Sequence, residues 1–269
     1  MNIDAIGLIA GNGRFPALFA RAAKRQNIKV VAAGIRGDTM FFLRYLVDRF
    51  AWFKVGQLKG LFEYFQREGV RQVIMAGQVN PANLFNESVK LDEEFTDLYA
   101  ALRDRKADTI FSAVAEKLKE NGLELLDSTL LLKDFLSPAG TLTKRGPGLS
   151  ELGDIEFGRT IAKSMGGLDV GQTVVIKEKA IVAIEAMEGT DRCILRGGQI
   201  ARKGAVIIKM SKPKQDLRFD VPVIGPRTIK TMIKARATCL AIEAGKTLII
   251  DRPQCVQLAN RFGICIVAS

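Results

Sequence analysis

Opposed charges are densest in residues 212–226, which read KPKQDLRFDVPVIGP. The three prolines of this stretch prevent a regular helix, so we expect an ordered, extended loop in which the alternation of Arg218, Phe219 and Asp220 places Arg218 and Asp220 on one face. Asp216 and Asp220 could hold a metal ion or activate water. The cations that could bind phosphoryl oxygens are Lys212, Lys214 and Arg218. Phosphate chemistry is the favoured interpretation, and a solvated charged surface is the alternative.

A second group of acidic residues lies in the stretch EAMEGTD at 185–191. Its carboxylates follow an expected strand, where side chains project into the crevice in which α/β sheets bind ligands. Glu188 and Asp191 are candidate ligands for Mg²⁺, which prefers oxygen donors, and Thr190 and Asp191 are candidate substrate contacts. The alternative is that Thr190 or Asp191 caps the helix that follows.

Two glycine-containing loops follow apolar runs in the first half of the chain. Gly11-Asn12-Gly13 resembles the glycine loop of a dinucleotide-binding fold, with Pro16 at the position of the third glycine. Gln78 and Asn80 follow another apolar run and could contact a nucleobase or ribose at the same sheet edge. The alternatives are plain structural turns at both places.

A turn-rich stretch, SPAGTLTKRGPG at 137–148, contains hydroxyls and cations close together. Thr143 and Lys144 are candidate substrate-binding residues, because Lys144 or its neighbour Arg145 could neutralise a phosphate. A solvated basic linker is the alternative.

The chain has no histidine and four cysteines. Without histidine, Ser-His-Asp and Cys-His catalysis and most catalytic zinc geometries are excluded. The cysteines lack metal-ligand spacing and are expected to be reduced, buried thiols. Chemistry therefore rests on carboxylates, cations, hydroxyls, backbone amides or a hard metal ion.

The elements that must position these residues alternate between strand and helix. Such alternation predicts an α/β fold with a parallel sheet in a Rossmann-like N-terminal domain, residues 1–135, and a second α/β domain, residues 136–269. The expected N-terminal strands are 3–10, 28–33, 53–56, 71–77 and 123–127, with helices at 15–26 and 58–68 and a helical pattern over 88–121. The expected C-terminal elements are helices 149–165, 191–203 and 227–236, a hairpin at 173–186, and strands 205–210, 239–243 and 247–250.

Basic charge is concentrated in the second half of the chain. Residues 1–135 hold 19 Lys and Arg against 17 Asp and Glu, a net +2, whereas residues 136–269 hold 21 against 12, a net +9. This charge suits an anionic ligand, a membrane surface or nucleic acid. No export signal or membrane-spanning stretch is visible, so a soluble cytoplasmic protein is expected.

Six stretches together resemble the UDP-2,3-diacylglucosamine pyrophosphatase family, LpxI. They are LIAGNGRFP, AGQVNP, LDVGQ, VAIEAMEGTD, KPKQDLRFDVPVIGPRTI and IEAGKTLIIDR. The resemblance runs nearly end to end, and the stretches around Glu188 and Asp220 are far more specific than the glycine loop.

The resemblance implies a Mg²⁺-dependent hydrolase acting on a UDP-linked diacylated sugar. It implies release of UMP and 2,3-diacylglucosamine 1-phosphate (lipid X) in lipid A biosynthesis, with Asp220 essential for catalysis. It also leaves room for peripheral contact with the inner membrane and for an oligomer. A non-catalytic nucleotide or glycolipid-binding protein is the alternative, whereas nucleic-acid binding is not expected because the sequence shows no basic helix or aromatic stacking platform.

Overall fold

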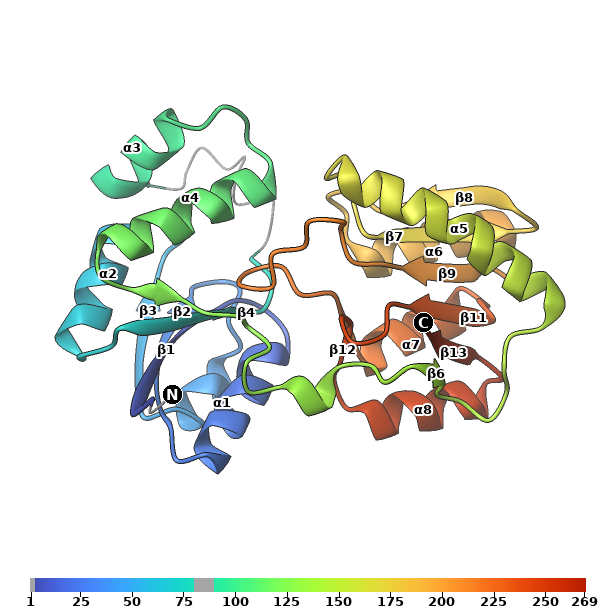
Figure 1. The fold of residues 1–269 in the computed structure, drawn as a ribbon, viewed down its shortest axis with the longest axis horizontal. Coiled ribbons are helices and arrows are strands. Elements are labelled where there is room, and N and C mark those ends of the chain that lie inside the picture. Colours follow the sequence, from blue (N-terminus) through green and yellow to red (C-terminus); the bar gives the residue numbers. More distant parts are fainter. Residues whose placement is uncertain (1–2, 80–89) are drawn as a thin grey trace. The chain divides into compact units, whose positions relative to one another are not determined.

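The computed structural model describes residues 3–79 and 90–269 of the chain. The chain divides into two compact units, unit 1 with residues 1–133 and 216–220, and unit 2 with residues 134–215 and 221–269 (Figure 1). The short segment 216–220 therefore belongs to unit 1, although the chain on both sides of it belongs to unit 2. Asn80, a candidate ligand contact, lies outside the described residues.

Unit 1 is a parallel sheet with helices on both faces. The strands run in the order β3-β2-β1-β4-β5, and each neighbouring pair is parallel. The strands are β1 (Ala5–Ala10), β2 (Lys29–Ile35), β3 (Arg49–Phe53), β4 (Gln72–Ala76) and β5 (Glu124–Leu125). The helices are α1 (Phe15–Arg25), η1 (Phe41–Tyr45), α2 (Leu58–Arg67), α3 (Glu93–Ala100) and α4 (Ala107–Glu120).

The apolar runs of unit 1 form its central strands because both sheet faces are covered. Helices α2, α3 and α4 pack through Phe65, Leu98 and Leu118 against Val31 and Val73 of the sheet, while α1 contacts β2 and β4. The strand order reverses between β1 and β4, which is the point where open α/β sheets bind ligands. The expected Rossmann-like domain is confirmed.

Unit 2 is built on a mixed sheet of order β6-β13-β11-β9-β7-β8. Strands β9, β11 and β13 are mutually parallel, and β6, β7 and β8 join antiparallel at the two sides. The strands are β6 (Gly140–Thr141), β7 (Thr173–Lys177), β8 (Ala180–Ile184), β9 (Val206–Lys209), β11 (Cys239–Ile242) and β13 (Cys265–Ala268). The remaining elements are η3 (Lys133–Phe135), α5 (Leu149–Gly167), α6 (Thr190–Ala201), β10 (Val223–Ile224), α7 (Pro226–Lys234), β12 (Leu248–Ile249) and α8 (Arg252–Arg261).

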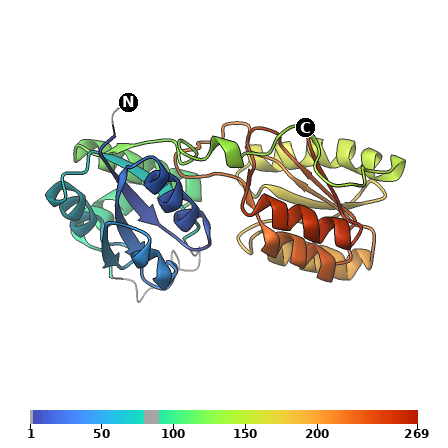
Figure 2. The ribbon, with the colours of Figure 1, turned by 90° about the horizontal axis from the view of Figure 1, so that it is seen from below.

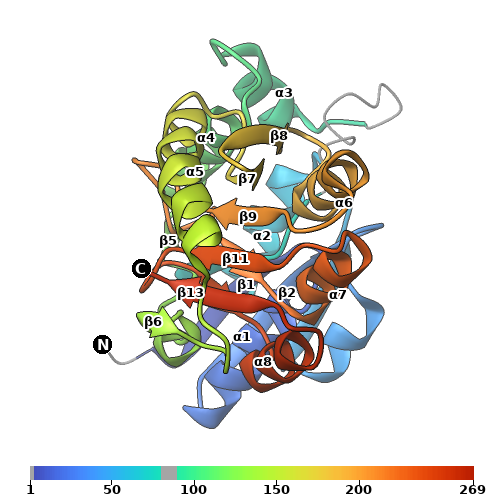
Figure 3. The ribbon, with the colours of Figure 1, turned by 90° about the vertical axis from the view of Figure 1, so that its right-hand side faces the viewer.

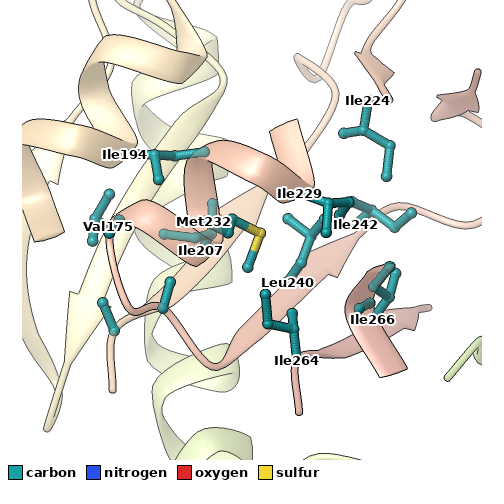
Figure 4. Close-up of a cluster of buried hydrophobic side chains, with 14 of the residues drawn as sticks. Val175, Ile194, Ile207, Ile224, Ile229, Met232, Leu240, Ile242, Ile264 and Ile266 are labelled. Atoms are coloured by element: carbon teal, nitrogen blue, oxygen red, sulfur yellow. The ribbon is translucent and has the colours of Figure 1, made fainter. Parts of the chain in front are cut away.

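Helices cover both faces of the unit 2 sheet. Viewed end on, α5 lies on one side of the row of strands and α6, α7 and α8 lie on the other (Figure 3), and the same separation of α5 from α8 is visible from below (Figure 2). The core between the sheet and α6, α7 and α8 includes the fully buried Ile194, Ile207, Met232 and Leu240 (Figure 4). The predicted second α/β domain is therefore confirmed.

The cysteines contribute to the interior of unit 2. All four are free and buried, as expected: Cys193, Cys239, Cys255 and Cys265. Burial raises the pKa of the Cys193 and Cys255 thiols to about 12. These two thiols therefore stay protonated and act as small apolar groups.

Several element predictions were wrong in detail. The helical pattern over 88–121 is interrupted after α3, and a new helix begins at Ala107. Just before it, the Asp104 carboxylate accepts hydrogen bonds from the Lys106 amide at 3.2 Å and the Thr109 hydroxyl at 2.6 Å. The strand expected at 53–56 lies earlier, at β3, and ends at Phe53. Within the described ranges, no helix is long and apolar enough to cross a membrane.

Candidate functional site

The two glycine-containing loops of unit 1 meet at the switch point of the sheet. The Gly11 amide donates to the Ala76 carbonyl at 2.8 Å, and Asn12 and Gln78 form an antiparallel bridge with N–O distances of 2.7 and 3.2 Å. The loops after β1 and β4 are therefore hydrogen-bonded to each other, in agreement with the prediction that both lie at one sheet edge. The side chains of Asn12 and Gln78 remain exposed.

The glycines of these loops are required by this close approach. A Cβ on Gly11 would lie 2.7 Å from the Gln78 carbonyl oxygen, and one on Gly77 would lie 2.5 Å from the Asn12 oxygen. Gly13 also has a positive φ of 91°, but a Cβ there would meet no atom within 4 Å. Gly11 thus has a structural role, while the chain from Gly13 leads into the N-terminus of α1, where backbone amides favour anions.

Segment 216–220 closes a turn at the same end of the unit 1 sheet. The Asp220 amide donates to the Asp216 carbonyl at 2.9 Å, so the expectation of an extended loop with Arg218 and Asp220 on one face is wrong. The Ser128 amide donates to the Leu217 carbonyl at 2.9 Å, and Ser128 follows β5. Bonds to the chain just past a sheet strand therefore bring Asp220 to the carboxyl edge of that sheet.

An aromatic contact and an ion pair stabilise this turn. The Phe219 ring stacks on Phe111 of α4 with centroids 5.6 Å apart. The Arg218 guanidinium binds the Asp216 carboxylate through Nε–Oδ1 at 3.0 Å and Nη2–Oδ2 at 2.7 Å. The hydrogen bond from Arg218 lowers the pKa of Asp216, so this carboxylate is ionised and its charge is balanced within the turn.

In unit 2, a buried lysine and glutamate meet at the carboxyl edge of the sheet. Lys209, the last residue of β9, donates to the Thr190 hydroxyl at 2.9 Å, and Thr190 donates to Glu185 Oε1 at 2.9 Å. The Lys209 side chain is 8% exposed and that of Glu185 is 12% exposed, with Nζ and Oε2 3.9 Å apart. Lys209 was not among the candidates from sequence, although a lysine directly after the apolar run Ala205–Ile208 could have indicated it.

One carboxylate oxygen of this cluster lacks a hydrogen-bond partner in the described part of the chain. Glu185 Oε2 is buried and accepts no hydrogen bond from the residues that the structure describes. A buried carboxylate oxygen without a partner carries a desolvation cost that a ligand hydroxyl or a hard cation would offset. Within residues 3–79 and 90–269, no group of three acidic, cysteine or histidine side chains forms a ready metal cage. A site with a single available carboxylate oxygen, such as Glu185 Oε2, would suit Mg²⁺, because this ion binds one or two carboxylates together with waters and phosphates.

The candidate metal ligands Glu188 and Asp191 are engaged in ion pairs. Glu188 Oε1 lies 2.6 Å from the Arg196 guanidinium, and Asp191 Oδ2 lies 2.6 Å from Arg227. Burial alone would raise the pKa of Glu188, but hydrogen bonds led by the one from Arg196 lower it overall. Neither Thr190 nor Asp191 caps α6, since the N-cap is Gly189 and no side chain bonds there.

Lys212, the first cation of the charged segment, is held within unit 2. Its Nζ lies 2.5 Å from Asp169 Oδ1, in a pair whose side chains are 10% and 17% exposed. It follows β9 by three residues and therefore stands at the same edge as Lys209. Lys214 is exposed.

Thr143 and Lys144 lie at the opposite, amino end of the unit 2 sheet. The Thr143 hydroxyl donates to the Arg145 carbonyl at 2.8 Å and accepts from the Ile266 amide at 3.0 Å, and the Lys144 amide donates to Asn260 Oδ1 at 2.8 Å. Arg145 binds both carboxylate oxygens of Glu151, at 2.6 and 3.0 Å. The structure therefore does not bring this loop together with Lys209 and Glu185.

Two open cavities lie away from these edges. One of about 430 Å³ in unit 1 is lined by Leu102, Asp108 and Ser112, and one of about 340 Å³ in unit 2 is lined by Asp154, Lys203 and Arg236. Neither contains a candidate residue. We consider the carboxyl edge of the sheet in each unit instead, because parallel sheets bind ligands beyond the carboxyl ends of their strands.

The architecture and these edges define a protein of two α/β units. Residues 5–135 match the LpxI N-terminal domain and residues 138–267 match the LpxI C-terminal domain, so the chain belongs to the LpxI family. It is 28% identical over 275 residues to UDP-2,3-diacylglucosamine pyrophosphatase LpxI of Caulobacter vibrioides, covering 97% of this chain and 96% of that protein.

Similarity to solved structures is much weaker. The biotin carboxylase domain of 2-oxoglutarate carboxylase from Hydrogenobacter thermophilus is 13% identical with a TM-score of 0.28, over 73% of this chain and 41% of that one. The pyruvate carboxylase of Rhizobium etli is 12% identical with a TM-score of 0.27, over 52% of this chain and 14% of that one. The chain spans less than half of either structure, and similarity this low carries no functional inference.

Proposed function

We propose that the protein hydrolyses the diphosphate of UDP-2,3-diacylglucosamine to UMP and 2,3-diacylglucosamine 1-phosphate (lipid X), as a step of lipid A biosynthesis. The name of the Caulobacter vibrioides relative and the match to both family domains support this activity. The structural observation that carries the proposal is the return of segment 216–220 into unit 1. It brings Asp220 to the sheet edge where α/β proteins bind phosphate ligands.

In this reaction, water adds its oxygen to one phosphorus of the diphosphate while the bond from that phosphorus to the bridging oxygen breaks. The leaving phosphate keeps the bridging oxygen, and attack at either phosphorus yields the same two products. We assign Asp220 to orient the water and take up its proton, or to hold Mg²⁺. Bound Mg²⁺ would offset negative charge on the phosphoryl oxygens.

Other residues at the sheet edge of each unit, taken separately, are assigned to binding. The chain at Gly13 and the N-terminus of α1 suit a phosphate of the substrate, and exposed Asn12 and Gln78 suit its nucleoside. In unit 2, Lys209 and Lys212 offer cationic donors to anionic oxygens, whereas the Thr190 hydroxyl would have to give up its hydrogen bond to Glu185 to donate to a ligand. Glu185 Oε2 would accept from a sugar hydroxyl or contribute to the Mg²⁺ shell. We place the protein in the cytoplasm, acting on a glycolipid of the inner membrane.

The test measures UMP released by purified protein from substrate dispersed in detergent, with Mg²⁺ or with a chelator. We expect turnover with Mg²⁺ and none with the chelator. We expect Asp220→Ala and Asp220→Asn to lower kcat by about 10³ or more. Asp97→Asn, which alters an exposed carboxylate of α3 in the same unit, is the control and keeps the parent rate.

Two results would contradict the proposal. If the parent protein is stabilised against heat by the substrate but releases no UMP, it is a glycolipid-binding protein rather than a hydrolase. If Asp220→Ala still turns over at near the parent rate, the assignment of the catalytic residue is wrong.

A further inference from the structure

Unit 1 exposes a contiguous set of large apolar side chains around η1. We call this set, together with Trp52 of β3, the aromatic face. Its four exposed members are Met40 at 41%, Phe41 at 56%, Phe42 at 40% and Tyr45 at 72% exposed. Exposure of this kind costs about 25 cal/mol per Å² of apolar surface, and clusters of such residues mark sites of interaction.

The aromatic face is held in place by contacts among its own residues. Leu43 of η1 is 1% exposed and anchors the segment in the core. Phe41 stacks on Trp52 with centroids 6.3 Å apart and an angle of 20° between the planes, and its ring meets Tyr45 edge-on at 6.1 Å. The exposed rings are therefore pre-ordered, which lowers the entropy cost of binding a partner.

Cations accompany the rings. The Arg44 guanidinium lies 5.1 Å from the centre of the Phe41 ring and 5.5 Å from that of Tyr45. Arg36 and Arg49 are also exposed nearby in sequence. Of the acidic residues in the same stretch, Asp38 is only 7% exposed, whereas Asp48 is exposed, although its Oδ2 accepts a hydrogen bond from the Val30 amide at 2.8 Å. Because Arg49 also pairs with Glu68 at 3.7 Å, the outward-facing charge is a small positive excess that comes from Arg36 and Arg44.

The aromatic face begins at the ligand-binding edge of the sheet. The Thr39 hydroxyl, one residue before Met40, donates to the carbonyl of Ala10, the last residue of β1, and accepts from the Ile35 amide at 2.7 Å. This ties the start of the face to the strand that leads into the Gly11–Gly13 loop. The face and this loop are therefore both attached at the carboxyl end of β1.

We propose that the aromatic face docks onto an anionic phospholipid bilayer. Phe41 and Tyr45 enter the headgroup layer, while Arg44 contacts lipid phosphates. These side chains suit this layer, since the Phe41 ring is apolar, Tyr45 adds a polar hydroxyl to an apolar ring, and the guanidinium stays at the phosphate level. The biological use of this docking rests on the proposed function, because the face would deliver the enzyme to a substrate held in the membrane. Vesicle binding itself is measured without substrate.

The experiment uses the full-length protein and an intrinsic reporter. Trp52 is the single tryptophan of the chain and belongs to the aromatic face. Vesicles of phosphatidylglycerol and phosphatidylethanolamine should shift its emission to the blue, and bromine-labelled phosphatidylglycerol should quench it. Phosphatidylcholine vesicles should have a much smaller effect, and salt should weaken binding.

Paired variants separate the face from the rest of the surface. We expect Phe41→Ser combined with Tyr45→Ser to weaken co-sedimentation with the anionic vesicles by about tenfold or more, since each ring buries apolar area. Arg44→Gln should weaken it less and reduce the salt dependence. Phe262→Ser is the matched control, because Phe262 is 51% exposed and Arg261 lies 5.6 Å above its ring in unit 2. Thermal unfolding verifies that each variant is folded.

Several outcomes would overturn this proposal. One is an unchanged Trp52 emission with anionic vesicles, and another is equal binding by the double variant and the Phe262→Ser control. A third is light scattering that shows a dimer which the double variant dissociates, since the face would then bind a second copy. UMP release from detergent-dispersed substrate is measured on the same samples, so that failure of docking with intact turnover is distinguished from failure of the proposed hydrolysis.

Discussion

The hydroxyl of Ser128 lies 2.7 Å from the carbonyl oxygen of Arg218, a residue 90 positions further along the chain. The same hydroxyl lies 2.5 Å from the carbonyl oxygen of Met75 in β4. Its single proton serves one of these acceptors at a time, so one fully buried serine joins the returning segment 216–220 to the sheet of unit 1.

Ser128→Ala should loosen this attachment. Loss of the hydroxyl leaves buried carbonyls without a donor, which costs about 1–3 kcal/mol of unfolding free energy. Because the segment carries Asp220, we also expect kcat to fall several-fold with a smaller change in KM. Urea unfolding and UMP release measure the two effects. Ser112→Ala, at an exposed position of α4, should change neither, and equal kcat in both variants would argue against a positioning role for Ser128.

Lys209 and Glu185 should depend on each other for stability. Lys209→Met leaves the Glu185 carboxylate buried without its cation and should cost about 3–5 kcal/mol. Glu185→Gln added to Lys209→Met should recover part of this loss, so the double variant is more stable than the sum of the single changes predicts. Chemical denaturation of all four proteins provides the cycle. Strict additivity would show that the two side chains do not interact.

Gly77→Ala should destabilise the protein more than Gly37→Ala. Both glycines have similar positive φ values, 90° and 88°, so both substitutions incur backbone strain of about 1–2 kcal/mol. Only the Cβ at position 77 would meet a backbone oxygen, at 2.5 Å, whereas position 37 has no atom within 4 Å. The difference between the unfolding free energies of the two variants measures the steric cost of a Cβ at position 77, where the two loops approach closely. Equal losses would mean that the loops separate easily.

The Arg145–Glu151 pair should make stability depend on acidic pH. Burial alone would raise the pKa of Glu151, but hydrogen bonds from Arg145 and the Gly148 amide outweigh it and lower the pKa. A lowered carboxyl pKa stabilises the fold above the usual carboxyl pKa, and this contribution disappears as pH falls through the lowered value.

Glu151→Gln should therefore cost about 1–3 kcal/mol at pH 7, the usual contribution of a hydrogen bond to a charged group. The loss relative to the parent should shrink as the pH is lowered towards 3. Denaturant unfolding across this pH range measures it. Glu156→Gln, at an exposed position of the same helix, is the control, and its unfolding free energy should follow that of the parent at every pH. If Glu151→Gln lost the same unfolding free energy at every pH, the ion pair would be excluded as the cause of the loss.

The regular part of the fold could be predicted because its strands are apolar and its helices amphipathic. β1, β4 and β9 are buried almost throughout, so their hydrophobic runs indicated them directly. We predicted no element for residues 251–269, where the structure has α8 and β13. Only Cys255 and Ala259 of α8 are buried, and two small buried side chains give little helical periodicity.

The site could be predicted less completely than the fold. Gly11, Gln78 and Asp220 could be named as candidates because glycine turns and charged, proline-rich stretches have local signatures, and their roles in binding and catalysis stay predictions. The place of Asp220 in unit 1 depends instead on Ser128 and Phe111, which are distant in sequence. Lys209 was missed for a related reason, since its burial beside Glu185 and Thr190 follows from strand order.

Because residues 216–220 belong to unit 1, neither unit is encoded by one continuous stretch of the gene. A protein truncated after residue 133 would lack the piece of chain that Ser128 and Phe111 hold. The second half, produced alone, would contain these five residues without Ser128 and Phe111, which contact them in the full chain. Exchanging either half with another protein would therefore separate residues 216–220 from Ser128 and Phe111.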